Sequence, residues 1–288
     1  MKRALLTVFI VLCMQSFAFA TWSVIALDRT TGQVIIASAT CVRQSRFPPR
    51  PSRDLMDVQA VIVPGIGVAA CQAGVDLTRE NQMIVYEELR KGTDPEQILE
   101  LLREHENKKE EPQIERRQFG ILDMQGRSAG FNGSRNNQAS LYVAGQVGDD
   151  IVFQVQGNIL FSDNVAYNAA LAFTQTTGTL ADRVMAAMEG ADEVGGDKRC
   201  TCEEEPKPAA SCYGKTSHVA YIAIANKEDA LGSSHNDGDY YAYISATDED
   251  IESHEDANPV KTLRMRYDAW KNAGSQRTGI PPSIIPEG

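Results

Sequence analysis

The stretch that decides the fold reads TWSVIALDRTTGQVIIASAT and spans residues 21–40. Residues 21–27 and 33–40 are rich in β-branched and apolar side chains, which favour strands. Residues 28–32 between them carry the polar side chains and the glycine of a turn. The sequence therefore predicts a β-hairpin, with Thr21 at the outer end of its first strand.

Residues 1–20, called the leader below, have the pattern of a signal peptide. Two basic residues precede an apolar run that is shorter than the roughly 20 residues of a membrane-spanning helix. The run ends in Ala18-Phe19-Ala20, with small residues at the two positions that a signal peptidase reads. We expect cleavage after Ala20, which makes Thr21 the first residue of a secreted or periplasmic protein. A cut after Ala18 is the alternative.

The charge of the chain disfavours two classes of partner. The formal net charge is −11 at pH 7, and loss of Lys2 and Arg3 with the leader makes it −13. An acidic surface repels nucleic acid, and no polybasic segment offers a membrane anchor. We expect neither nucleic acid nor a membrane as partner. The length suits one domain, residues 21–273, followed by a loose tail, residues 274–288.

The rest of the chain alternates between groups of strands and groups of helices. Strands are predicted at residues 60–64, 67–71, 118–124, 127–131, 141–144, 151–155, 218–225 and 240–246. Helices are predicted at residues 78–91, 93–106, 163–174, 180–189 and 259–272, the second opening on the capping box Thr93-Asp94-Pro95-Glu96. Such segregated elements favour an α+β fold, in which two antiparallel sheets lie between helix layers. The charged stretch 248–256 lacks the spacing of a Ca²⁺ loop and is interpreted as a solvated loop.

The cysteines suggest disulfides, because an oxidising compartment favours them. Of the six cysteines one lies in the leader, and the others are Cys41, Cys71, Cys200, Cys202 and Cys212. Cys41 and Cys71 both end β-like runs and could form one bridge, and Cys200 or Cys202 could pair with Cys212. An odd number leaves at least one thiol unpaired. A zinc site of Cys200, Cys202, Cys212 and His218 is a weaker alternative because its spacing is unusual.

Thr21 is the strongest candidate nucleophile. A hydroxyl needs a base to take its proton, and a chain-terminal threonine carries one, since a free α-amine has a pKa of about 7.7 to 8. Cleavage of the leader would create this amine without a self-processing step. The alternative is that a small hydroxyl residue merely permits cleavage. Cys71 paired with one of the scattered histidines is a distant alternative.

Six blocks of sequence resemble, in the same order, the Ntn-hydrolase-fold (N-terminal-nucleophile) family called domain of unknown function 1028. The blocks are TWSVIALD (21–28), GVA with QA (67–73), RQFGILD with GR (117–127), VQGNIL (155–160), GGDKR (195–199) and NPV with LR (258–264). The hairpin of residues 21–40 is also similar to the opening of proteasome β-subunits. The resemblance implies a four-layer αββα sandwich with two antiparallel sheets and Thr21 as nucleophile, but no settled substrate.

Two departures from these relatives concern the site. The family's Asp-Arg-Arg-Gly continuation is Asp197-Lys198-Arg199-Cys200 here, and the loop beyond it is larger and bears cysteines. The lysine that follows the second strand of proteasome subunits has no counterpart, and the nearest cation is Arg43.

Five further residues are candidates for the site. Gly157 and Asn158 suit an oxyanion hole, because glycine lets backbone amides approach a substrate and an asparagine can donate to a developing charge; a strand-end turn is the alternative. Asp197 could orient the amine and Arg199 could bind a substrate carboxylate, unless the two form a plain ion pair. Gln72 lies in a block shared with the family and is a candidate substrate-binding residue.

The sequence thus predicts an exported hydrolase that cleaves an amide bond in a small molecule or peptide, with no metal or organic cofactor. The rival is a non-catalytic secreted binding protein that keeps the fold. A homodimer through a helix layer is suggested by fold analogy alone.

Overall fold

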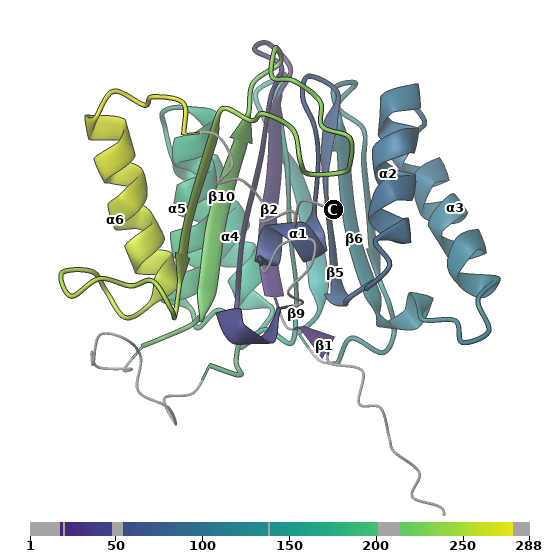
Figure 1. The fold of residues 1–288 in the computed structure, drawn as a ribbon, viewed down its shortest axis with the longest axis horizontal. Coiled ribbons are helices and arrows are strands. Elements are labelled where there is room, and N and C mark those ends of the chain that lie inside the picture. Colours follow the sequence, from purple (N-terminus) through teal and green to yellow (C-terminus); the bar gives the residue numbers. More distant parts are fainter. Residues whose placement is uncertain (1–17, 20, 48–53, 138, 201–213, 279–288) are drawn as a thin grey trace, which may run out of the picture.

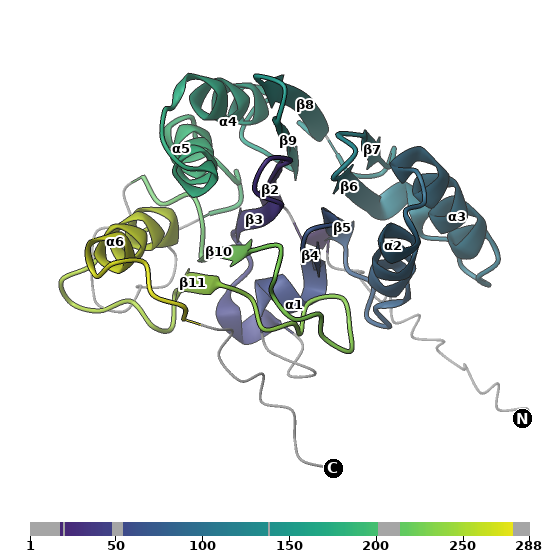
Figure 2. The ribbon, with the colours of Figure 1, turned by 90° about the horizontal axis from the view of Figure 1, so that it is seen from above.

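The structure is a computed structural model, and it describes residues 18–19, 21–47, 54–137, 139–200 and 214–278. Two antiparallel β-sheets face one another, and helices cover the outer face of each sheet (Figure 1). Seen from above, the layers follow in the order helices, sheet, sheet, helices (Figure 2). The layered α+β sandwich expected from the sequence is confirmed.

The first sheet has six strands in the order β11-β10-β3-β2-β9-β8. Its strands are β2 (Thr21–Asp28), β3 (Gln33–Thr40), β8 (Leu141–Val147), β9 (Ile151–Asn158), β10 (Val219–Ala225) and β11 (Ala242–Thr247). The predicted hairpin is β2 with β3, and its turn closes with Gly32 at a φ of 73°, which glycine adopts without strain. Because β2 lies between β3 and β9, Thr21 is opposite Thr40 on one side and Asn158 on the other.

The second sheet has five strands, in the order β1-β5-β6-β7 with β4 also paired to β5. Its strands are β1 (Ala18–Phe19), β4 (Ala60–Val63), β5 (Gly67–Gly74), β6 (Arg117–Asp123) and β7 (Ser128–Asn132). Strand β1, which belongs to the leader, was not predicted from the sequence. The short helix α1 (Leu55–Gln59) was not predicted either; its first turn is capped by Asp54, which accepts from Met56 N at 3.0 Å.

The outer layers contain the predicted helices. They are α2 (Glu80–Lys91) and α3 (Pro95–Asn107) on the five-stranded sheet, and α4 (Asn164–Gln175), α5 (Leu180–Glu193) and α6 (Pro259–Asn272) on the six-stranded sheet. The prediction of a capping box at Thr93 is wrong. Asp94 caps α3 by accepting from Glu96 N at 3.0 Å, and the Thr93 hydroxyl donates to Glu88 instead. Two single 3₁₀ turns, Gln44–Arg46 and Ile114–Arg116, complete the described elements. Within the described residues no helix has the length and apolar character needed to cross a membrane.

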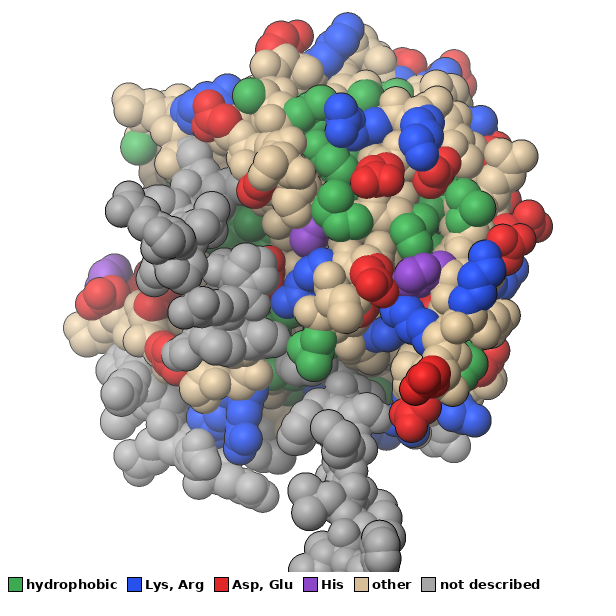
Figure 3. All heavy atoms as spheres, turned by 45° about the vertical axis from the view of Figure 1, so that its right-hand side comes forward, with side chains coloured by type: hydrophobic (Ala, Val, Ile, Leu, Met, Phe, Trp, Pro, Cys, Tyr) green, Lys and Arg blue, Asp and Glu red, His purple; other side chains and the backbone are tan. Residues whose placement is uncertain are grey.

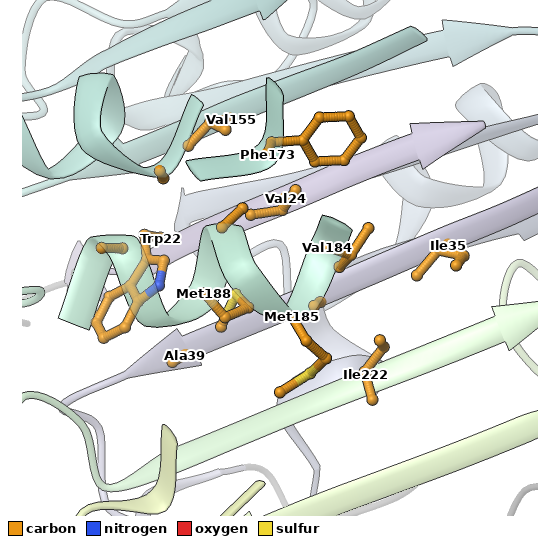
Figure 4. Packing of buried hydrophobic residues seen from close by; sticks show 14 of the residues in the cluster. Trp22, Val24, Ile35, Ala39, Val155, Phe173, Val184, Met185, Met188 and Ile222 are labelled. Carbon is orange, nitrogen blue, oxygen red and sulfur yellow. The ribbon is translucent and has the colours of Figure 1, made fainter. Parts of the chain in front are cut away.

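The described hydrophobic residues form three buried clusters, one in each space between layers. Trp22, Met185 and Met188 belong to the cluster between the six-stranded sheet and its helices (Figure 4). A second cluster fills one half of the space between the sheets, and a third lies under α2 and α3. On the outer surface over α2 and α3, acidic and basic side chains are interspersed (Figure 3).

The space between the sheets has an apolar half and a polar half. Alternate residues of a strand point to opposite faces, so the residues of β2 that face the other sheet are Thr21, Ser23, Ile25 and Leu27. Ile25 and Leu27 lie in the inter-sheet cluster, whereas Ser23 bonds to a polar side chain of β5. The neighbouring strands also change from apolar to polar side chains toward this end. The polar residues are Ser38 and Thr40 on β3 and Gln156 and Asn158 on β9. Buried polar side chains therefore gather at the end where Thr21 lies.

The first part of the expected loose tail lies against the sheet. The backbone N–H of Thr278 donates to Tyr241 O at 3.2 Å, and Tyr243 N donates to the Thr278 hydroxyl at 2.9 Å. Residues 274–278 thus extend along β11 after α6, and residues 279–288 lie outside the described part of the chain.

Candidate active site

Thr21 is the first residue of β2 and is buried between two polar side chains of its own sheet. Its partners across the strands, Thr40 and Asn158, are buried as well. Side chains of directly opposed residues have Cβ atoms about 4.5 to 5.5 Å apart. The hydroxyl of Thr21 donates to that of Thr40 across 3.4 Å. The register of the hairpin therefore brings a second hydroxyl, which the sequence analysis missed, beside the candidate nucleophile.

Gln72 reaches this position from the opposite sheet. Its Nε2 donates to the backbone oxygen of Thr21 at 3.2 Å, and its Oε1 accepts from Ser23 Oγ at 2.8 Å and from Gln59 Nε2 at 2.6 Å. The side chain is almost fully buried. Gln72, predicted to belong to the site, therefore links the two sheets by hydrogen bonds next to Thr21.

Gln118 of β6 extends the amide network to Asn158. Its Oε1 accepts from Gln72 Nε2 at 2.8 Å and from Asn158 Nδ2 at 3.2 Å, and its Nε2 donates to Gly157 O at 2.8 Å. Gln118, Ser23 and Gln59 were not predicted to belong to the site. The alternation of polar with apolar residues along the strands was the sequence signal that could have indicated them.

Asn158, which lies opposite Thr21 in the sheet, keeps hydrogen-bonding capacity. An amide NH₂ has two donor hydrogens, and one of them is used on Gln118. Its Oδ1 is buried and has no hydrogen-bond partner among the residues that the structure describes. β9 includes both Gly157 and Asn158 and ends there, and the positive φ expected for the alternative, a strand-end turn, falls on Ile159 instead, at 54°. Gly157 is needed for packing, since a Cβ there would come within 2.7 Å of the Leu160 side chain.

Asp197 lies at the same end of the six-stranded sheet. It forms an isolated bridge with Leu160, and its Oδ2 accepts from the backbone N–H of Cys41 at 2.9 Å. Gly196 allows this turn to lie on Trp22, because a Cβ would come within 2.7 Å of the indole ring. Asp197 therefore holds the chain directly after Thr40.

Arg199 forms an ion pair with Asp197. Its Nη2 lies 3.0 Å from Asp197 Oδ2, and its Nε donates to Oδ1 at 3.2 Å. The Asp197 side chain is buried, whereas that of Arg199 is 33% exposed. The ion-pair alternative is thus observed, and in this arrangement the guanidinium neutralises Asp197.

A disulfide joins Cys41 to Cys200, so the predicted pairs Cys41–Cys71 and Cys200–Cys212 are wrong, whereas the alternative pair Cys202–Cys212 lies outside the described residues. Cys41 directly follows β3 of one sheet, whereas Cys71 lies on β5 of the other and points toward α2 and α3, where it is buried as a free thiol. Burial raises the pKa of the Cys71 thiol, which argues against Cys71 as a nucleophile. Cys202 and Cys212 lie outside the described residues. Cys200 is not available as a zinc ligand, and no group of three His, Cys, Asp or Glu side chains in the described part of the chain could hold a metal.

We expect Gln118→Leu to lower the free energy of unfolding by about 1 to 3 kcal/mol, the usual cost of leaving buried hydrogen-bonding groups unpaired. The substitution keeps the volume but removes the partners of Gly157 O and Asn158 Nδ2. Urea denaturation of the purified protein measures the effect. Gln146→Leu is the matched control, because the exposed Gln146 bonds to Gly148 O only two residues away. Equal stabilities of the two variants would contradict the role of Gln118.

The fold and the site together define a class: a layered α+β sandwich with a buried threonine and amide network between the ends of its sheets. Family comparison identifies the particular group. The model of the family described as "Family of unknown function (DUF1028)" matches residues 21–205, and the chain belongs to this family. The crystal structure of a DUF1028 protein from Silicibacter pomeroyi is similar, with a TM-score of 0.59 and 20% identity over 88% of this chain and 86% of that one. No curated protein matches the chain.

Proposed function

We propose that the mature protein is an exported hydrolase of the N-terminal-nucleophile type, which cleaves an amide bond with Thr21. The observation that carries this proposal is the position of Thr21 at the tip of a central strand, surrounded by amide side chains that can bind charge without titrating. Two further facts support it. The family match begins at Thr21, and the Cys41–Cys200 disulfide fits an oxidising compartment.

The reaction would proceed in two steps through an acyl-enzyme. In the first step the Thr21 α-amine takes the hydroxyl proton while Oγ attacks the substrate carbonyl carbon and forms a C–O bond. The C–N bond then breaks, and the leaving nitrogen receives the proton from the amine. In the second step the amine takes a proton from water, whose oxygen attacks the ester carbon. The C–O bond breaks, which releases a carboxylic acid and restores the Thr21 hydroxyl.

Asn158 would have two roles in this reaction, one toward the oxyanion and one toward the α-amine. Its second Nδ2 hydrogen can donate to the oxyanion that forms on the carbonyl, in a site from which water is largely excluded. Its buried Oδ1 can accept a hydrogen from the α-amine, which gains hydrogens when the peptide bond ahead of Thr21 is cut. The neutral amides of Gln72 and Gln118 would hold Asn158 and Thr21 in register.

Asp197 would be a positioning residue. It holds the backbone of Cys41, the residue after Thr40, and its charge is balanced by Arg199. Its effect on the reaction would pass through the end of β3, which supplies the hydroxyl beside Thr21.

A hydroxyl-directed acylating probe, such as a β-lactone, tests the proposal on the exported protein. We expect intact mass spectrometry to show a chain that starts at Thr21 and gains one probe adduct. Labelling should be lost in Thr21→Ala and kept in Thr174→Ala, which changes an exposed threonine on α4. Labelling that persists in Thr21→Ala, or a mature chain that starts elsewhere, would overturn the assignment. A correctly processed chain without labelling would favour the secreted binding protein.

A further inference from the structure

The last two residues of β5 have β1, a part of the leader, as their strand partner on one side. On one side β6 pairs with β5 from Gly67 to Ala73. On the other side β4 pairs only with residues 67–70, and β1 pairs antiparallel with Ala73 and Gly74. Cleavage ahead of Thr21 removes β1. Residues 71–74 of β5 would then pair with no described strand on this side in the mature protein.

This open edge adjoins the candidate nucleophile. A single residue, at position 20, separates β1 from Thr21, and an extended chain advances about 3.3 Å per residue. Gln72, which belongs to this edge, donates to Thr21 O at 3.2 Å. Figure 1 shows β1 at the lower end of the sheets, beside β5 and close to the end of β9. A strand bound at this edge would therefore end at Thr21.

The backbone at the edge is held in a defined shape. Ala73 has a φ of 71°, and the Gly74 carbonyl accepts from Arg117 Nη1 at 2.6 Å. A Cβ at Gly74 would lie 3.0 Å from Arg116 O, so a side chain there would require the neighbouring backbone to shift. Ala73 is buried in the chain that carries β1. Because an open strand edge presents unpaired main-chain N–H and C=O groups, this edge favours a ligand with its own main-chain donors and acceptors.

A small polar cavity, with room for about one water molecule, lies beside the edge. It is lined in part by Gln72, Gly74, Asn81, Gln82 and Arg117. Three buried atoms of these residues have no hydrogen-bond partner among the described residues: Asn81 Oδ1, Gln82 Oε1 and Arg117 Nε. Buried polar atoms are normally paired with protein groups or water. The cavity thus offers both acceptors and a donor next to the unpaired stretch of β5.

We propose that the substrate is an extended peptide whose acyl side adds to β5 at Ala73 and Gly74 as a short antiparallel strand. This inference rests on the proposed function and names its substrate class. The bound peptide runs in the direction of β1, so its carboxyl end points toward Thr21. Two residues of the peptide occupy the places of Ala18 and Phe19. The carbonyl that Thr21 Oγ attacks belongs to the residue that directly follows them.

Coumarin amides with acyl parts of different length test the proposal on the mature protein. The probes are N-acetyl-Ala and N-acetyl-Ala-Phe-Ala amides of aminomethylcoumarin, and two forms of the longer probe, methylated on the nitrogen of either the first Ala or the Phe. Adjacent residues of a strand direct their main-chain groups to opposite sides. We expect kcat/KM to be at least about 10-fold higher for the long probe, which corresponds to about 1.4 kcal/mol. One methylated form should fall at least about 10-fold, and the other should stay within about 2-fold.

The outcomes separate this inference from the proposed function. Thr21 labelling by the small β-lactone probe reports on the nucleophile alone. If Thr21 is labelled but the short and long amides are cleaved equally, both methylated forms match the parent, or no amide is cleaved, the peptide inference is wrong and the nucleophile assignment stands. If Thr21 is not labelled, the proposed function fails, and this inference fails with it.

Discussion

A protein that retains Ala20 ahead of Thr21 is expected to react about 10² to 10⁴ times more slowly with an acylating probe than the chain that starts at Thr21, the usual contribution of a general base. The hydroxyl and the surrounding amides are all kept in this variant. The nitrogen of Thr21 is then part of a peptide bond, whose lone pair is delocalised and is not basic. The comparison therefore isolates the contribution of the free amine.

The rate of labelling, followed by mass spectrometry, measures this effect in both proteins over a range of pH. An amine acts as a base only when deprotonated, so the rate of the mature chain should rise with pH through the ordinary α-amine pKa of about 7.7 to 8. The form with Ala20 should lack this rise. Thr21→Ser is the control that keeps both the amine and a hydroxyl, and it should retain labelling. Equal rates with and without Ala20 would exclude the amine as the base.

Removing the disulfide by Cys41→Ala together with Cys200→Ala is expected to lower the free energy of unfolding by about 2 to 5 kcal/mol, the range found for native disulfides. The bridge joins residues 159 positions apart, and a long closed loop restricts the unfolded chain strongly. Urea denaturation of the variant and the parent, without reductant, measures the difference. Cys71→Ala is the control, because it removes a buried thiol without opening a cross-link.

The same variant should also weaken the site. Cys41 N donates to Asp197 Oδ2, and Cys200 ends the turn that carries Asp197. Without the bridge this turn is held to β3 by hydrogen bonds. We therefore expect the rate of Thr21 labelling to fall together with the free energy of unfolding. A variant as stable as the parent, or a parent in which both thiols can be alkylated before reduction, would refute the predicted role of the bridge.

Most elements of the fold were predictable because their signals are local. The alternation of apolar side chains, the turn at residues 28–32 and proline at the start of α3 and α6 each act over a few residues. The errors have local causes too. Helix α1 has five residues, too few to show a helical period. Asp94, and not Thr93, is the N-cap of α3, because it directly precedes Pro95 at the first helical position.

The candidate site was predicted in part. Thr21, Gln72 and Asn158 came from chain position and family resemblance, and the structure brings all three together. Thr40 and Gln118 were missed because their closeness to Thr21 follows from strand register and from the packing of one sheet on the other. A shift of one residue in either register would turn these side chains to the opposite face.

The sequence by itself determined the hairpin, the order of strands and helices, the acidic charge and the threonine that follows the leader, because each depends on neighbouring residues or on composition. The tertiary structure alone decided which residues surround Thr21, which cysteines pair and which edge of β5 the leader covers. These contacts join residues up to 159 positions apart. They follow from how two twisted sheets meet, which no local pattern of side chains encodes.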